Sequence, residues 1–399
     1  MRIAFITTEY VNNKTFDGGL ANYIRRVSLA LARMGHQPLV IFFSDCHKES
    51  EADGVKIIQV KYTRRWWFKI LNLFTLRRFT TFLELLNLSL LLNAKLKEEH
   101  GKQEIHIVQY TSLGGVGFFR LRGIPSVIRV SSLTSLCRKK GGYDRLGPFA
   151  ARQQELLERW AFKKADSLFG PSYVIAAAVK QDAKRDVRVI ESPFVLDNEE
   201  LDTSLYEKFL KDKKYLFYFG KLNVLKGMVV IAGILEKLLA RYPELYFVFV
   251  GKEDAGYEGK TMREYLLEKA GDYHDRLIFL GALSHARLYP MLERAQAVVL
   301  PSLIDNFPNA CIEAMAFKRV VIGTYDTSFE QLIEDGRSGF LAAPEDATSL
   351  YEAVSRALDL SEAARKKMGE KAAQRIEDLE PRKVVEQLVR FYEEIVGEQ

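Results

Sequence analysis

The sequence predicts an α/β protein with two doubly wound, mostly parallel sheets, and three observations lead to this expectation. The chain has 399 residues, a length that favours two domains. Short, continuously apolar runs such as Arg2–Thr8 have the length of strands that are buried on both faces. These runs alternate with helical patterns through both halves of the chain, as βαβ units do.

The composition is that of a globular protein. Lys and Arg number 58 against 52 Asp and Glu, and this net charge of +6 is too small to argue for a nucleic-acid partner. The three cysteines, Cys46, Cys137 and Cys311, lack metal-ligand spacing and suit a reducing compartment. The first residues indicate a buried strand rather than a signal peptide, and no apolar run is long enough to span a bilayer. We therefore expect a cytoplasmic protein.

The first half is predicted to open with a βαβ unit. After the strand Arg2–Thr8, a polar loop ends at Gly18-Gly19, where a helix over 20–34 begins. Two glycines at a helix start let a phosphate approach the backbone, although an ordinary turn has the same pattern. The other expected elements are strands at 37–43, 55–60, 105–110, 126–130, 167–170 and 187–190, helices at 79–96, 118–122, 150–165 and after Ser172, and a basic surface loop at 133–148.

Residues 61–78 mix basic and aromatic side chains and contain no acid. Arg64, Arg65, Trp66 and Trp67 stand next to one another within this segment. Such a mixture suits the headgroup boundary of an anionic membrane. The alternative is a loop and helix packed on the domain, with the arginine side chains reaching outward to water.

The polar segment 192–213 is predicted to separate the two domains, because no clear strand occurs in it. The expected domains are therefore 1–195 and 210–378. The second domain is expected to hold strands at 215–219, 245–250, 276–280, 297–300, 319–322 and 338–341 and helices at 226–241, 260–270, 285–294, 309–317, 327–334, 346–359 and 361–375, with a last helix at 381–396.

The stretch Pro301–Ala316, PSLIDNFPNACIEAMA, carries the carboxylates Asp305 and Glu313 on either side of a turn. Pro308 can open a helix near Asn309, because its missing N–H would be unpaired there. The free N–H groups of a helix start attract anions. The combination suits a ligand with hydroxyls and phosphates, and the alternative is a corner with ordinary surface acids.

The turn Gly220–Gly227, GKLNVLKG, places Lys221 and Lys226 between a strand and a helix. Two cations next to a helix start can neutralise a diphosphate, although a solvated turn with surface lysines has the same composition. No paired-aspartate motif for a divalent metal is evident, so we expect neither a metal nor a cofactor.

These motifs together resemble the family 4 retaining glycosyltransferases of the GT-B fold. The resemblance rests on Gly18-Gly19 and, in order, on GKLNVLKG, FVFVG, IFLGALSHARLYPMLERA, PSLIDNFPNACIEAMAFKRVVI and EDGRSGFLAAPED. It implies two Rossmann-like domains facing across a cleft. The acceptor would bind mainly to the N-terminal domain and the nucleotide-sugar donor mainly to the C-terminal one. A terminal helix within 381–399 would pack back on the first domain.

The resemblance also implies roles for the matched residues. Lys221 and Lys226 would hold the donor diphosphate, Glu313 would hold the ribose hydroxyls, and Asp305 would face the donor sugar. The implied catalytic residues are Asp305, Lys226 and Glu313. The further implied donor contacts are Gly18 and Gly19 near the diphosphate, together with Phe307, Pro308 and Asn309, which match a loop whose backbone amides meet the sugar or phosphate.

Three positions depart from the family pattern. Asp305 stands where Glu is usual, and Lys221 where Arg is usual, which gives a point charge in place of a bidentate fork. Ser131 falls where many members carry a His near the donor sugar. We expect Ser131 and Ser132 on the sugar or acceptor side, because they follow a strand at the edge where ligands bind.

The resemblance implies transfer, with retention of configuration, from a nucleotide-diphosphate-sugar to a hydroxyl of a glycan or lipid-linked acceptor. Bacterial surface polysaccharide or lipid-linked glycan synthesis, on the cytoplasmic face of the membrane, is the expected context. The rival interpretations are a nucleotide-sugar epimerase or hydrolase of similar fold and a non-catalytic sugar-nucleotide-binding protein.

Overall fold

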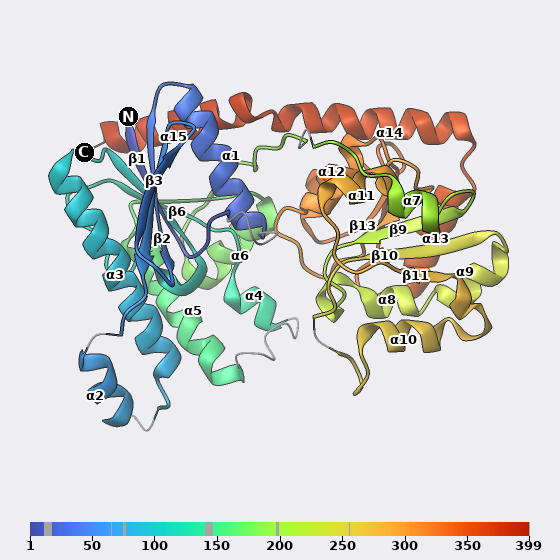
Figure 1. Cartoon of the computed structure of the whole chain (residues 1–399), viewed down its shortest axis with the longest axis horizontal. Coiled ribbons are helices and arrows are strands. Elements are labelled where there is room, and N and C mark those ends of the chain that lie inside the picture. Colours follow the sequence, from blue (N-terminus) through green and yellow to red (C-terminus); the bar gives the residue numbers. More distant parts are fainter. Residues whose placement is uncertain are drawn as a thin grey trace. The chain divides into compact units, whose positions relative to one another are not determined.

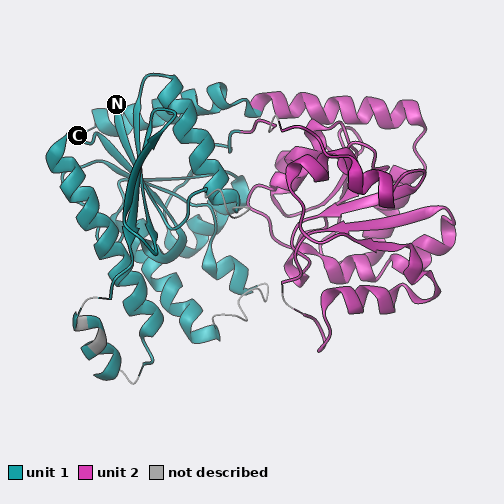
Figure 2. Ribbon diagram, in the orientation of Figure 1, with its two compact units in different colours: residues 1–193, 379–399 teal, residues 194–378 magenta. Residues whose placement is uncertain are grey.

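The computed structural model describes residues 1–11, 18–64, 66–74, 77–139, 147–196, 199–254 and 256–398. These residues form two compact units (Figure 2). Unit 1 comprises residues 1–193 and 379–399, and unit 2 comprises residues 194–378. Each unit holds a parallel or mostly parallel sheet with helices packed against it (Figure 1). The predicted class, two doubly wound α/β domains, is confirmed.

The described residues of unit 1 form an eight-stranded sheet in the order β3-β4-β2-β1-β5-β6-β7-β8. Its neighbouring strands are parallel except for β3 and β4, which are antiparallel. The strands are β1 (Arg2–Thr7), β2 (Gln37–Ser44), β3 (Lys48–Ala52), β4 (Val55–Lys61), β5 (Ile107–Thr111), β6 (Ser126–Arg129), β7 (Ser167–Gly170) and β8 (Arg188–Val189).

Two apolar cores cover the faces of this sheet. One core is built with α1 and α15, and the other with α3, α5 and α6. The hydroxyl of Tyr392 on α15 donates to Gln109 Oε1 on β5 at 2.5 Å, which ties the last helix to the sheet. The helices of unit 1 are α1 (Gly19–Arg33), α2 (Trp66–Phe74), α3 (Thr80–Lys102), α4 (Thr134–Lys139), α5 (Gly147–Lys164), α6 (Tyr173–Ala183) and α15 (Pro381–Gly397).

Unit 2 holds a parallel six-stranded sheet in the order β11-β10-β9-β12-β13-β14. The strands are β9 (Lys214–Phe219), β10 (Leu245–Val250), β11 (Leu277–Phe279), β12 (Ala297–Val299), β13 (Val321–Thr324) and β14 (Phe340–Ala342). The α-helices are α7 (Ser204–Phe209), α8 (Met228–Ala232), α9 (Leu235–Arg241), α10 (Met262–Lys269), α11 (His285–Leu292), α12 (Asn309–Ala316), α13 (Ala347–Leu358) and α14 (Glu362–Ile376). Short 3₁₀ turns occur at 113–115 in unit 1, at 224–226, 271–276 and 328–331 in unit 2, and at 377–379.

Two expectations for unit 1 were wrong. Residues 118–122 form a turn rather than a helix, since Phe118 N and Arg120 N donate three residues back, to Gly115 O and Gly117 O. Part of the expected loop at 133–148 is the helix α4, and residues 140–146 lie outside the described part of the chain.

Two expectations for unit 2 also need correction. The single helix expected at 226–241 is broken into α8 and α9 at Gly233, where an added Cβ would lie 2.9 Å from the Cβ of Ala347. The helix expected at 327–334 is a 3₁₀ turn, whose Phe329 ring covers Gly323 so closely that a Cβ there would clash.

Candidate functional site

The predicted donor-site residues of unit 2 lie at one edge of its sheet, in loops or, for Asn309 and Glu313, in the helix α12 that follows one of these loops. The loops at 220–227, 251–254 and 300–308 follow β9, β10 and β12. Because all six strands are parallel, their carboxyl ends meet at the same edge. Ligands of open α/β sheets bind at this edge.

The loop 220–227 is fastened to the loop after β12. Asn223 Oδ1 accepts from Lys226 N at 3.0 Å, and Leu303 N donates to Leu225 O at 2.9 Å. Gly227 has a φ of +78°, and a Cβ there would lie 2.0 Å from the carbonyl oxygen of Pro301. Only glycine permits this approach, so the lysine loop and the carboxylate loop share one fixed arrangement.

Lys226 and Asp305, which are 79 residues apart in the sequence, are in direct contact. Lys226 Nζ lies 2.5 Å from Asp305 Oδ2, and their side chains are 33% and 15% exposed. Ser328, which follows the next strand β13, donates from Oγ to the backbone oxygen of Asp305 at 2.7 Å. This bond holds the loop that carries Asp305. The pair is therefore reachable from solvent and is positioned by three separate loops.

Lys221 pairs with a different acid. Its Nζ lies 3.9 Å from Asp254 Oδ2, and Asp254 also accepts from Asn223 Nδ2 at 3.5 Å. The backbone oxygen of Lys221 accepts from the hydroxyl of Tyr218 at 2.7 Å, while its side chain is 67% exposed. Sequence reasoning missed Asp254, although its place after the strand at 245–250 was a usable signal.

Glu313 is buried in the second turn of α12, which begins at Asn309 directly after Pro308 as predicted. Glu313 Oε2 lies 3.9 Å from His285 Nε2, and the His285 ring stacks on Tyr289 with centroids 5.0 Å apart. Sequence reasoning missed His285, which begins α11 just after β11. Phe307 and Pro308 are buried in the loop before the helix.

Cys311, two residues before Glu313 in the chain, is not a suitable nucleophile. Burial raises the pKa of its thiol well above the ordinary value, and Asp305 adds to this effect. Its Sγ instead contacts Met315 Sδ at 3.5 Å. The residue therefore serves packing rather than covalent chemistry.

The two glycines of unit 1 stand at the start of α1. Gly18 has φ −66° and ψ 172°, values that any residue adopts, and Gly19 is the first helical residue. A Cβ at position 18 would lie 3.4 Å from Glu9 Oε1. The absence of a side chain here leaves the helix start open and is not required by the turn itself.

Ser131 and Ser132 follow β6. Ser131 Oγ accepts from Arg129 Nη1 at 2.6 Å, and the backbone oxygen of Ser132 accepts from Ser112 Oγ at 3.0 Å. Arg129 also donates to Ser192 Oγ at 2.7 Å and lies 3.5 Å from the ring centre of Tyr23. Sequence reasoning missed this Arg, whose pKa is lowered by burial, although an arginine that ends an apolar strand is unusual.

The basic aromatic segment forms α2 together with the residues that flank it. Trp66 is 75% exposed, and Arg64 Nη2 lies 2.8 Å from Glu84 Oε1. Arg65 and the side chain of Trp67 lie outside the described part of the structure. Helix α2 is packed on unit 1 through Phe68, which is 2% exposed, while Trp66 is turned to solvent.

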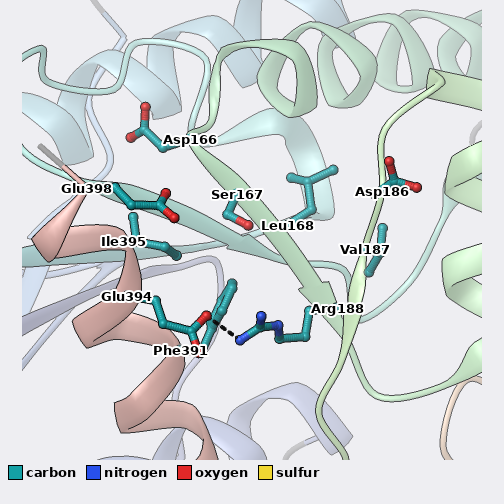
Figure 3. A pocket seen from close by; sticks show the side chains of 10 residues that line it. All are labelled: Asp166, Ser167, Leu168, Asp186, Val187, Arg188, Phe391, Glu394, Ile395 and Glu398. Carbon is teal, nitrogen blue, oxygen red and sulfur yellow. Dashed lines mark hydrogen bonds and ion pairs between the residues drawn. The ribbon is translucent and has the colours of Figure 1, made fainter.

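The described parts of each unit contain a hollow. One, of about 520 Å³, lies in unit 1 where the amino ends of β7 and β8 meet α15; Arg188 there pairs with Glu394 at 2.6 Å (Figure 3). The other, of about 380 Å³, lies in unit 2 beside the lysine loop. It is lined by Leu222, Phe249, Gly251, Lys252, Glu253, Arg263, Phe279, Gly281 and Ala282. The hollow in unit 2 lies at the sheet edge that carries the predicted site, and the one in unit 1 does not.

The described residues hold neither a cluster of metal-ligating side chains nor a helix that could span a membrane. No group of three or more His, Cys, Asp or Glu gathers there in a way that suits a metal ion. No helix among them has the length and apolar content needed to cross a bilayer.

The fold is that of the GT-B glycosyltransferases. Sucrose-phosphate synthase from Thermosynechococcus elongatus superposes with a TM-score of 0.77 at 19% identity, covering 100% of both chains. Anabaena HepE, solved with UDP and glucose, superposes with a TM-score of 0.68 at 15% identity, covering 98% of this chain and 99% of HepE. At these identities the likeness establishes the fold alone.

The sequence then gives the family. Residues 205–375 match the model of the group 1 glycosyl transferases, and residues 18–191 match that of the glycosyl transferase 4-like domain. Together the two matches cover most of the chain, which belongs to the group 1 glycosyltransferases. A phosphatidyl-myo-inositol mannosyltransferase of Mycolicibacterium smegmatis is 27% identical over 198 residues, 49% of each chain. The match thus spans about half the length of that relative.

Proposed function

We propose that this glycosyltransferase moves a sugar from a nucleotide-diphosphate-sugar to a hydroxyl acceptor with retention of configuration. The observation that carries the proposal is the contact between Lys226 and Asp305 at the sheet edge, where helix α12 with Glu313 begins after the same loop as Asp305. A cation and two carboxylates on one strand edge match the needs of a ligand with phosphates and vicinal hydroxyls.

The donor would be held by groups with separate tasks. Lys221 and Lys226 neutralise the diphosphate, and Glu313 accepts hydrogen bonds from the ribose hydroxyls. The hollow beside Lys221 has the size of a small-ligand site and would receive the nucleoside. The remaining proposed donor contacts are Gly18 and Gly19 and the backbone of Phe307, Pro308 and Asn309.

Asp305 would change partner when the donor binds. Before binding, its carboxylate neutralises Lys226 at 2.5 Å. A diphosphate carries more negative charge than one carboxylate and would draw Lys226 to itself. Asp305 is then free to accept hydrogen bonds from the donor sugar. Ser328 keeps the Asp305 backbone in place throughout, because it bonds the backbone oxygen rather than the side chain.

The chemistry builds negative charge on the leaving diphosphate and positive character on the sugar. We propose that lysines and helix N–H groups stabilise the leaving group without a metal. We identify no covalent nucleophile, since Cys311 is buried with a raised thiol pKa. Attack on the same face of the sugar, with a leaving phosphate oxygen accepting the acceptor's proton, then accounts for retention.

The acceptor would be a glycan or a lipid-linked molecule on the side of unit 1, with Ser131 and Ser132 as sugar- or acceptor-side residues. A lipid-linked acceptor is supported by the name of the mannosyltransferase relative, which acts on a phosphatidyl-inositol, and by the exposed basic aromatic segment. We propose peripheral contact with the cytoplasmic face of a bacterial membrane, where three free thiols would stay reduced.

The test is a panel of nucleotide sugars, scored for release of nucleoside diphosphate and for product stereochemistry, with and without lipid acceptors. We expect one or a few donors to be used, an acceptor-dependent rate, a retained anomer, and no loss of activity in EDTA. Turnover that needs no acceptor would favour an epimerase or hydrolase. Donor binding without turnover on any acceptor would favour a non-catalytic role.

A further inference from the structure

We propose that α2, residues 77–79 and the outer face of α5 form one docking surface for an anionic lipid bilayer. This inference rests on the proposed function, because a transferase with a lipid-linked acceptor needs a surface that brings it to the membrane. The surface itself follows from exposure, packing and charge within unit 1.

Helix α2 turns its apolar side outward. Trp66, Ile70, Leu73 and Phe74 follow helical spacing on one face and are 75%, 45%, 75% and 80% exposed. Phe68, on the opposite side, is 2% exposed and anchors the helix. A surface helix ordinarily buries its apolar stripe and exposes its polar one. The reversed orientation of α2, which projects beyond the end of α3 in Figure 1, indicates that another apolar phase covers this face.

The exposed apolar surface continues from α2 onto α5. The rings of Phe79 and Phe149 meet with centroids 5.7 Å apart, and Gln153 Nε2 donates to the backbone oxygen of Arg78 at 2.9 Å. Phe149 and Leu156 remain 51% and 41% exposed on the outer face of α5. Residues 77–79 therefore join the two helices into one surface.

The charges on this surface have a single sign. On α5, Arg152, Arg159 and Lys163 are exposed, whereas the acids Glu155 and Glu158 are buried. Within the described parts of 66–83 and 147–164, every exposed charged side chain is basic. A surface that interleaves aromatic and aliphatic side chains with Lys and Arg is complementary to anionic headgroups above an acyl layer.

The geometry fits a surface that lies on a bilayer. Helix α2 has nine residues, too few to span a membrane but enough to place one apolar face at the headgroup boundary. Aromatic rings flanked by arginines prefer this boundary, where one end of the side chain is apolar and the other is wet. A neutral membrane would bury the apolar side chains but offer no anionic partners to the basic ones. Binding should therefore depend on anionic lipid.

Tryptophan fluorescence of the unaltered protein tests the proposal directly. The chain has three Trp residues, Trp66, Trp67 and Trp160, and all belong to α2 or α5. We expect vesicles of phosphatidylglycerol and phosphatidylcholine to shift the emission to shorter wavelength, and brominated acyl chains to quench it. Pure phosphatidylcholine vesicles should do so at least severalfold more weakly. Unchanged emission with the anionic vesicles would overturn the proposal.

Vesicle flotation of variants identifies the surface. The triple change Trp66→Ser, Leu73→Ser and Phe74→Ser should lower the partition coefficient by about tenfold or more, and Arg152→Gln with Arg159→Gln by severalfold. The matched control is Val195→Ser with Leu201→Ser, which alters side chains that are 50% and 49% exposed in unit 2 and should float normally.

Among the results with the variants, two would overturn the assignment. One is flotation of the triple variant equal to that of the wild type. The other is that the wild type forms a dimer in solution, that the triple variant is a monomer, and that neither of the two binds vesicles. The surface would then join two copies of the chain. Normal nucleoside diphosphate binding by the triple variant would confirm that the change acts on docking alone. Normal flotation of an inactive protein would count against the proposed transfer reaction and leave the docking surface standing.

Discussion

At the residue scale, the sequence identified Lys226 and Asp305 separately but did not predict their contact. The motifs placed each residue at the carboxyl end of a strand, and the strand order that brings those ends together was not visible in either motif. The same limit applies to His285 beside Glu313 and Asp254 beside Lys221. Contacts between loops depend on which strands are neighbours, and a single sequence gives only the order along the chain.

The substitution Asp305→Asn tests the proposed exchange of partners. It removes the charge that holds Lys226 and keeps the size of the side chain. We expect nucleoside diphosphate to bind as well as or a few times better than in wild type, because Lys226 no longer has a competing carboxylate. Turnover should fall about 10- to 100-fold, since hydrogen bonds to a charged group contribute about 1.5–3 kcal/mol. Calorimetric titration and initial rates measure both quantities, and a tenfold loss of nucleotide affinity would instead make Asp305 a support for Lys226.

Glu158 should make stability depend on pH. Burial raises its pKa from 4.5 to about 7, although Thr134 Oγ1 donates to it at 2.6 Å. Protonation therefore favours the folded state, and this contribution, on the order of 3 kcal/mol, is present below pH 4.5 and lost as the pH rises to about 7. Thermal unfolding of Glu158→Gln should show a smaller decline between pH 5 and 8 than the wild type, while Glu352→Gln, an exposed control, should follow the wild type. Parallel curves for Glu158→Gln and wild type would contradict this assignment.

At the scale of elements, most helices and strands followed from periodicity, and the exceptions have local causes. Strand β3, Lys48–Ala52, is exposed along its whole length and lacks apolar alternation, so its pattern gave no strand signal. The following Asp53-Gly54, both with positive φ, is the hairpin turn that pairs β3 with β4 and was a usable signal. The break between α8 and α9 falls at Gly233, which packs against Ala347 in α13, more than a hundred residues away, and no local pattern contains this contact.

Gly227 should be essential to the arrangement of the donor loops. Gly227→Ala adds a Cβ that would lie 2.0 Å from the carbonyl oxygen of Pro301, at a φ of +78°. Gly259→Ala is a matched control, because its φ is +76° and nothing lies within 4 Å of the added atom. We expect the control to cost about 1 kcal/mol of unfolding free energy and Gly227→Ala to cost clearly more, with weaker nucleotide binding. Equal denaturant midpoints for the two variants would refute the close packing of these loops.

At the scale of the whole molecule, the chain ends in the unit in which it begins. Helix α15 belongs to unit 1, and Leu388, in its apolar face, is 1% exposed. Leu388→Ala should therefore lower the stability of unit 1 by about 2–4 kcal/mol. Hydrogen exchange should report faster exchange within residues 1–193 and little change within 194–378, and Leu201→Ala, at an exposed site, should change neither. Faster exchange confined to 194–378 would show that the last helix stabilises the other unit.

The family and the fold were predictable from sequence because the motifs of 215–350 are dense and lie on strand ends that parallel sheets bring together. The direction in which α2 faces was not predictable, since the mixture of basic and aromatic residues over 61–78 suits both a membrane boundary and a helix packed on the domain. Whether a helix exposes or buries its apolar side chains depends on how the whole molecule packs. This exposure distinguishes a core helix from a docking helix.

The most direct test of the account compares transfer rates of the wild type, Glu313→Ala and Lys226→Ala with the donor and acceptor that the panel identifies. Glu370→Ala, at an exposed position in α14, serves as the control. If the edge of the unit 2 sheet binds the donor, kcat/KM should fall at least about 100-fold in both site variants and stay unchanged in the control. Full activity in either site variant, with the variant protein folded, would contradict the central claim that these residues hold the nucleotide sugar.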